Sequence, residues 1–221
     1  MFDNIFDMLS KFQLSKGKIT PFNDDLYDYF REKLKSRVSK SRYEHTLGVV
    51  DTAIMISKAY DVDENKAKLA ALLHDWDKCY DDHEMKRRIK ELGLDHMIDP
   101  FVKDNMPKVM HGLTAACYFG YNYSAIPVDV LEAIANHTIA NKHMTGLSMT
   151  IYCADALEPN RKYKSRAEIY NKIGKISLHE LFIEVYKHTL FDITNKGKLM
   201  YPETSKVWNT HIKKQIENNI K

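Results

Sequence analysis

Six residues that could bind metal ions end apolar stretches on several predicted helices of this 221-residue chain. Most of them fall three, four or seven positions from small or aliphatic residues, which places them on the buried face of a helix. They are His45, His74, Asp75, His111, His137 and Asp155. Because a buried carboxylate is costly unless it is paired or bound to a cation, these side chains are candidates for a shared metal centre.

The segment 67–76 carries the clearest of these patterns. Its alanines share one helical stripe with His74. Its leucines share a second stripe with Trp76, about 100° around the helix. A helix that is apolar on two stripes is expected to be buried. A His-Asp pair alone would also fit a helix end with a surface acid. The other four candidates are therefore needed to argue for a metal centre.

The number and type of these side chains favour two metal ions. Imidazole nitrogens and carboxylate oxygens suit iron, manganese or zinc, and the set contains no thiolate. Four histidines and two aspartates are too many for one catalytic ion that keeps an open position. Two ions bridged by one aspartate would fit, and such centres activate a water and clamp phosphoryl oxygens. The residues therefore predict hydrolysis of a phosphoester or a phosphoanhydride.

The elements that must position these residues are all predicted to be helices. Periodic apolar residues predict helices near 22–38, 42–60, 61–75, 83–92, 107–120, 127–137, 147–158, 165–174, 178–193 and 203–219. Asp61 and Glu64 resemble a capping box at the start of the third, and residues 77–84 form an acidic, polar connection. No alternating strand pattern and no repeat of fixed period is present. The prediction is an all-α helical bundle.

The same pattern predicts one domain over residues 21–221, preceded by an N-terminal extension at residues 1–20. The extension has apolar residues at helical spacing, so it is either an amphipathic helix that docks on the body or on a second subunit, or a frayed end.

Composition limits the classes of partner and compartment. The net charge of +3, from 33 basic and 30 acidic residues, is too balanced to favour nucleic acid or a membrane surface. A local cluster of cations could still bind an anionic small molecule. Three cysteines without a Cys-x-x-Cys pair, and no signal peptide, predict free thiols in the cytoplasm. The sequence contains no apolar run of about 18 residues, so no transmembrane helix is predicted.

Four sequence blocks carry a resemblance to a known family. They are Glu44-His45-Thr46-Leu47-Gly48-Val49, Ala70-Ala71-Leu72-Leu73-His74-Asp75, Asn136-His137-Thr138 and Ala154-Asp155-Ala156-Leu157-Glu158-Pro159-Asn160-Arg161. Together they resemble the HD-domain metal-dependent phosphohydrolases, in particular the YqeK-type branch, over about residues 25–190. The resemblance implies an HD-domain helical bundle with a binuclear metal site that cleaves diadenosine tetraphosphate symmetrically to two ADP. It implies iron as the metal, with manganese or another transition metal as the alternative.

The resemblance also distributes the ligands over two ions. One ion would be held by His45, His74, Asp75 and Asp155. Asp75 would bridge to a second ion, which His111 and His137 would complete.

Four cationic or polar residues are implied to act on the substrate. Lys78 would work beside the catalytic Asp75 and face the phosphates, and Arg161 would hold phosphate oxygens with its fork-shaped guanidinium. Lys142 and His143 are further substrate-binding candidates, although the loop departs from the family. Where the family usually has an arginine, Lys142 keeps the charge and loses the bidentate geometry.

Two other functions stay open at this point. An HD-domain phosphohydrolase of another nucleotide, such as a nucleoside monophosphate or an alarmone, would share the metal ligands. A non-catalytic HD module would share the fold, but its ligand set is usually incomplete. The expected partner is a dinucleoside polyphosphate or another nucleotide, and a homodimer is a further expectation.

Overall fold

The computed structural model describes residue 7 and residues 24–163 and 165–220, and every regular element within the two long ranges is a helix. The predicted all-α fold class is confirmed. The predicted extension at residues 1–20 lies outside the described residues, apart from residue 7. The helices are α2 (Asp24–Arg37), α3 (Lys40–Tyr60), α4 (Glu64–Leu73), α5 (Asp82–Glu91), α6 (Pro100–Asn105), the 3₁₀ helix η1 (Pro107–Met110), α7 (His111–Asn122), α8 (Val128–Asn136), α9 (Gly146–Leu157), α10 (Arg166–Tyr170), α11 (Leu178–Asn195) and α12 (Thr204–Ile220).

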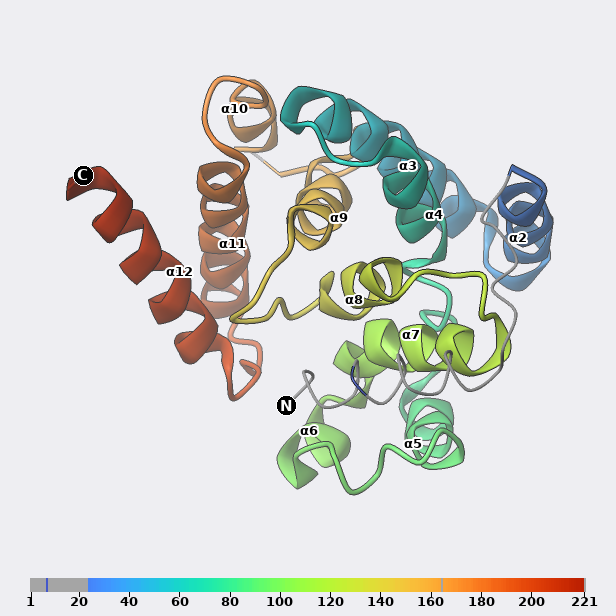
Figure 1. The fold of residues 1–221 in the computed structure, drawn as a ribbon. Helices are drawn as coiled ribbons and strands as arrows, with labels where there is room; N and C mark the ends of the chain where they lie inside the picture. Colours follow the sequence, from blue (N-terminus) through green and yellow to red (C-terminus); the bar gives the residue numbers. More distant parts are fainter. Residues whose placement is uncertain (1–6, 8–23, 164, 221) are drawn as a thin grey trace.

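Helix α8 lies at the centre of the arrangement. It packs against α4, α7 and α9, while α3 packs against both α4 and α9. Figure 1 shows α5, α6 and α7 on one side of α8, with α3, α4 and α9 on the other. Helix α11 packs on α9, and α12 lies outside it at the edge of the molecule (Figure 1). The ends of α4 and α8 and the start of α7 therefore meet near the middle of the bundle.

Capping residues set where the helices around this meeting point begin. The side chain of Asp63 starts α4, because it accepts hydrogen bonds from the backbone N–H groups of Asn65 and Lys66, each at 3.0 Å. The prediction of a capping box at Asp61 is wrong. Asp61 instead ends α3 with a left-handed φ of 54°, a conformation that aspartate tolerates better than most residues.

Two other segments differ from the helices predicted from the sequence. Pro107 opens a 3₁₀ helix, so the α-helix begins only at His111. The helix predicted over 165–174 is limited to Arg166–Tyr170. It cannot extend through Gly174, whose φ of 74° is left-handed and whose N–H donates to the Tyr60 hydroxyl at 2.9 Å.

A buried ion-pair network fixes the segment that follows α4. Asp77 is fully buried, although the sequence predicted it as part of a polar connection. Its two carboxylate oxygens accept hydrogen bonds from Arg37 and Arg88, each at 3.1 Å. Arg37 also donates to the backbone carbonyl of Trp76 at 2.8 Å. The chain just after the His-Asp pair is thus tied to α2 and α5.

Candidate metal centre

The structure brings all six predicted metal ligands together where α3, α4, α7, α8 and α9 meet. His45 lies in the second turn of α3 and Asp155 in the last turn of α9. The other four stand at helix ends: His74 and Asp75 follow α4, His111 begins α7, and His137 follows α8. All of them are buried except Asp155, whose side chain is 22% exposed.

The carboxylate of Asp75 lies between two pairs of histidines. Its Oδ2 is 3.5 Å from His74 Nε2 and 3.8 Å from His45 Nε2. Its Oδ1 is 3.0 Å from His111 Nε2 and 3.5 Å from His137 Nε2. Each oxygen therefore faces a different pair, which is the geometry that a bridging carboxylate requires.

Asp155 completes the first of two donor groups. Its Oδ1 lies 3.0 Å from His45 Nε2 and 3.8 Å from His74 Nε2. His45, His74 and Asp155 offer ligand atoms that all lie within 4.8 Å of one another, and His74, Asp75 and His137 form a second such group. The described side chains thus include two adjacent His/Asp groups that could bind metal.

Backbone carbonyls orient three of the four histidines. The Nδ1 atoms of His74, His111 and His137 lie 2.6, 2.7 and 2.7 Å from the carbonyl oxygen of the residue three positions earlier. Carbonyls in the last turn of a helix lack a partner further along the helix, so a ring N–H three residues on can satisfy them. With Nδ1–H donating to a carbonyl, the lone pair of Nε2 points into the centre.

A carboxylate orients the fourth histidine. His45 Nδ1 lies 3.0 Å from Oε1 of Glu158, which is 1% exposed, and the other carboxylate oxygen accepts from the backbone N–H of Asn160 at 2.7 Å. Gly48 makes room for this contact, because a Cβ there would lie 2.8 Å from Glu158 Oε2. Glu158 and Gly48 belong to the sequence blocks that carry the family resemblance, but nothing in the sequence indicated that they meet at His45.

Two further residues crowd the second donor group, and sequence reasoning missed both. A Cβ on Gly112 would lie 2.7 Å from the Ile134 carbonyl oxygen and 2.9 Å from His137 Nδ1. Thr138 Oγ1 lies 3.0 Å from His137 Nε2 and 3.2 Å from His111 Nε2. Gly112 therefore leaves space for the hydrogen bond that orients His137, and Thr138 places a hydroxyl beside both ring nitrogens.

Buried nitrogens without partners show that this donor set fits a cation. The Nε2 atoms of His45 and His74 are buried and have no hydrogen-bond partner among the described residues. The Nε2 atoms of His111 and His137 are 2.9 Å apart, although both rings have their Nδ1–H directed at carbonyls. Facing lone pairs and unpaired buried nitrogens are unfavourable without a cation. Imidazole and carboxylate donors suit a divalent transition metal.

The pKa values of most donors favour the protonation states that bind metal. Burial and the charge of Lys78 lower the pKa of His111 to about 4, and burial lowers the pKa of His137. Burial opposes ionisation of Asp75, but the charge of His74 and hydrogen bonding to the other histidines hold its pKa well below the usual range. Burial lowers the pKa of His74, but the charge and hydrogen bond of Asp75 together with the charge of Asp155 raise it overall, so a metal that binds there competes with a proton.

Lys78 and Arg161, two of the residues predicted to bind phosphate, border the centre. Lys78 Nζ lies 3.3 Å from His111 Nε2 and 3.9 Å from Asp75 Oδ1. Arg161 donates through Nε to the backbone carbonyl of Asp155 at 2.9 Å and through Nη2 to the Asp155 carboxylate. Both side chains are 38% exposed, so each reaches from the ligands to the surface.

Arg42 is a third cation at this border, and sequence reasoning did not identify it. Its Nη1 donates to Asp75 Oδ2 at 2.8 Å, and its side chain is 33% exposed. The sequence feature that could have identified Arg42 is its position three residues before His45, which puts both residues on one face of α3.

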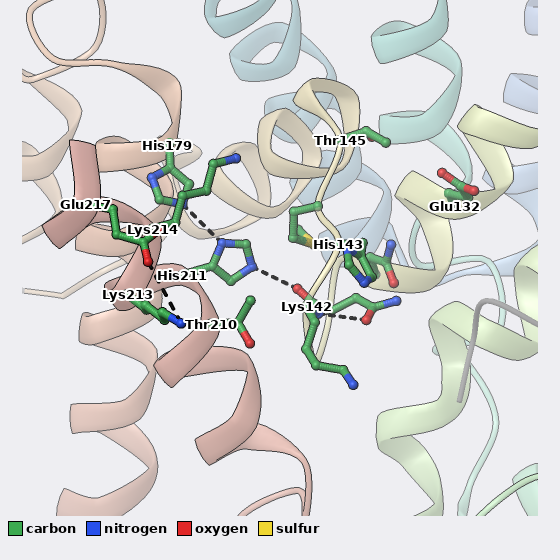
Figure 2. Close-up of a pocket in the computed structure, with 13 residues that line it drawn as sticks. Glu132, Lys142, His143, Thr145, His179, Thr210, His211, Lys213, Lys214 and Glu217 are labelled. Atoms are coloured by element: carbon green, nitrogen blue, oxygen red, sulfur yellow. Dashed lines mark hydrogen bonds and ion pairs between the residues drawn. The ribbon is translucent and has the colours of Figure 1, made fainter. Parts of the chain in front are cut away.

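The last two predicted substrate-binding residues, Lys142 and His143, line a separate pocket of about 820 Å³. This pocket lies between the end of α8, the loop 141–145 and helices α11 and α12 (Figure 2). None of the six predicted metal ligands lines it. Substrate binding by Lys142 and His143 therefore stays a prediction.

Comparison with protein families decides what kind of protein this is. The family model described as HD domain matches residues 42–160, a span that contains all six predicted ligands and more than half of the chain. The chain belongs to the HD-domain family.

Relatives of this HD-domain protein confirm the resemblance to the YqeK-type branch. It is 32% identical over 176 residues to a Halalkalibacterium halodurans protein named bis(5'-nucleosyl)-tetraphosphatase, symmetrical, with 80% of this chain and 91% of that protein covered. A Bacillus subtilis protein of the same name is 31% identical over 177 residues, with 80% and 92% covered.

A solved structure supports the fold of this HD-domain protein. A Clostridium acetobutylicum chain, described as a predicted HD superfamily hydrolase involved in NAD metabolism, matches with a TM-score of 0.78 at 26% identity. The match covers 88% of this chain and all of that chain. No helix among the described residues is long and apolar enough to cross a bilayer.

Proposed function

We propose that this HD-domain protein hydrolyses diadenosine tetraphosphate at its central phosphoanhydride and releases two molecules of ADP. The observation that carries the proposal is the position of Asp75, whose two oxygens face two different pairs of histidines. The names of the relatives from H. halodurans and B. subtilis supply the substrate and the symmetry of the cleavage.

The proposal assigns two divalent ions to the centre. His45, His74, Asp75 and Asp155 would hold one ion, and Asp75, His111 and His137 would hold the other. Iron is the proposed metal because the YqeK-type resemblance implies it, and manganese is the alternative. Bound there, the two ions would supply an activated water and offset negative charge on the phosphoryl oxygens.

The chain's own cations would hold the phosphates around this centre. Lys78, Arg42 and Arg161 each place their charged group against a ligand residue, and each side chain is about a third exposed to solvent. Two of them carry guanidinium groups, which can bind phosphate oxygens in a bidentate manner. Because Arg161 also binds Asp155 through two groups, it would both position that ligand and contact the substrate.

A substrate panel tests this function against the runner-up activities. Protein purified without oxygen and loaded with iron or manganese should turn over diadenosine tetraphosphate faster than a nucleoside monophosphate or an alarmone. Rapid turnover of a nucleoside monophosphate without turnover of diadenosine tetraphosphate would move the protein to another HD-domain activity. No turnover of any of them by metal-loaded protein would favour a non-catalytic HD module.

A further inference from the structure

The pocket that holds Lys142 and His143 has two chemically different ends (Figure 2). Helix α8 contributes Glu132 and Asn136, which are four residues apart and therefore share one face of the helix. Helix α12 contributes Lys213 on the other side of the pocket. Figure 2 shows Glu132 well away from Lys213, with the loop that carries Lys142 between them.

The α8 end presents a hydrogen-bond acceptor without a partner. Asn136 is 2% exposed, and its Oδ1 is buried with no hydrogen-bond partner among the described residues. A buried acceptor left unpaired is costly, so a turn of the Asn136 side chain toward a pocket occupant that donates a hydrogen bond would relieve this cost. The side chain of Glu132 lines the same end. Hydroxyl or amino groups are the chemistry that this end would recognise.

The opposite end gathers positive charge. Lys142 comes from the loop, and Lys213 and Lys214 come from α12. Glu217 also lines the pocket from α12, and its carboxylate lies 3.9 Å from Lys213 Nζ. Several lysines around one cavity favour a ligand with more than one negative charge, such as a phosphate chain.

Hydrogen bonds hold the two walls of the basic end together. His211 of α12 donates from Nε2 to the backbone carbonyl of Asn141 at 2.9 Å. With that proton on Nε2, its Nδ1 accepts from His179 Nε2 of α11 at 3.1 Å. The loop, α11 and α12 are thereby joined, so the segments that carry the lysines of the pocket are held together without a ligand.

We propose that this pocket binds a nucleotide, with the nucleoside against Asn136 and the phosphate chain against Lys142, Lys213 and Lys214. A ribose and a base carry the hydrogen-bond donors that the α8 end lacks, and the phosphates carry the charge that the α12 end favours. The volume of about 820 Å³ falls within the range of about 300–1,000 Å³ that is usual for small-molecule sites.

Two kinds of ligand would supply a nucleotide of this chemistry to the pocket. The source is either a free nucleotide or the far half of a dinucleoside polyphosphate whose other half lies at the metal centre. The second source rests on the proposed function, whereas the first does not. Asn136 directly precedes the predicted ligand His137, so the pocket adjoins the centre along the chain.

The first experiment measures ADP binding by isothermal titration in the full-length, metal-loaded protein. The variant Lys213→Gln/Lys214→Gln removes two charges from the pocket, and both lysines are exposed, so the fold should survive. The control Lys187→Gln/Lys206→Gln removes two exposed charges from α11 and α12 outside the pocket. We expect ADP affinity to fall about tenfold in the first variant and to stay unchanged in the control. Equal affinities in both double variants would overturn the proposal.

A second experiment locates the bound nucleotide directly. Photolysis of the wild-type protein with 8-azido-ADP, followed by peptide mapping, should label residues within 132–136 or 210–217. Labelling confined to peptides outside these two ranges would contradict the proposal, whatever the affinities.

Cleavage kinetics of the same variants separate the two sources. If the pocket holds half of the substrate, Lys213→Gln/Lys214→Gln should raise KM for diadenosine tetraphosphate about tenfold with kcat retained. If it holds a free nucleotide, KM should stay unchanged while ADP binding is still weakened. A protein that cleaves no diadenosine tetraphosphate would overturn the proposed function, yet the ADP titration and the labelling would still decide the nucleotide site.

Discussion

At the scale of single residues, the orientation of each histidine in the candidate metal centre depends on the group that hydrogen-bonds to its Nδ1 atom. Three histidines use a carbonyl in their own helical turn, so their orientation follows from local structure. The fourth, His45, depends on Glu158, which lies 113 residues away in the sequence. The clustering of the six candidate ligands could be predicted because most of them end an apolar stripe. Glu158 and Gly112 could not, because their roles arise only where helices pack together.

We predict that Glu158→Gln weakens metal binding about 10–100-fold, as loss of a carboxylate that orients a ligand histidine usually does. The amide keeps the shape of the side chain but loses the charge that fixes the His45 tautomer. Metal titration followed by elemental analysis measures the effect, and circular dichroism checks the helices. The control is Glu91→Gln, whose carboxylate is on the surface 3.6 Å from Arg87. Equal metal affinity in the two variants would show that Glu158 does not support His45.

The bridging position of Asp75 gives a second prediction at this scale. Asp75→Ala should empty both metal positions, because each of its oxygens faces a different donor group. His137→Ala should mainly weaken the position near His111. Elemental analysis of the purified variants measures the metal content per chain. Fully active wild-type protein with at most one metal per chain would contradict a two-ion centre.

At the scale of the elements, the α-helices that carry the candidate ligands could be predicted from the sequence, while α6, the 3₁₀ helix η1 and several helix ends could not. The apolar periodicity predicted the helices that carry the ligands. The sequence pattern predicted Asp61 as the cap of α4, whereas the structure uses Asp63. Both aspartates lie just before the helix, and only the backbone conformation shows which of them is its N-cap. Asp77 was predicted in a polar connection, because its two arginine partners lie in α2 and α5 and give no local signal.

We predict that Asp77→Ala lowers the free energy of unfolding by about 3–5 kcal/mol, since it leaves buried arginine charge without its partner. Urea denaturation followed by circular dichroism measures the loss. The control is Asp129→Ala, which removes a carboxylate 2.6 Å from Lys66 that is 40% exposed. This exposed pair should contribute no more than about 1 kcal/mol. A similar small loss in both variants would mean that the network around Asp77 does not stabilise the segment after the His-Asp pair.

At the scale of the whole molecule, the bundle places two sites next to each other along α8. The candidate metal centre lies where α8 ends against α4 and α7, and the basic pocket lies where the following loop meets α12. The centre was predictable because its residues share one chemistry and one pattern. The pocket was not, because Glu132, Asn136 and the α12 lysines look like ordinary surface or helix residues until the fold brings them together.

The products released early in the reaction test the central claim most directly. Metal-loaded protein should convert diadenosine tetraphosphate to ADP alone, because a centre with cations on several sides can hold the phosphates flanking the central bridge. In water enriched in heavy oxygen, one of the two ADP molecules should carry one label, since water is the nucleophile. Chromatography and mass spectrometry at low conversion measure both outcomes. Equal amounts of ATP and AMP at early times would instead show asymmetric cleavage and would contradict the proposed reaction.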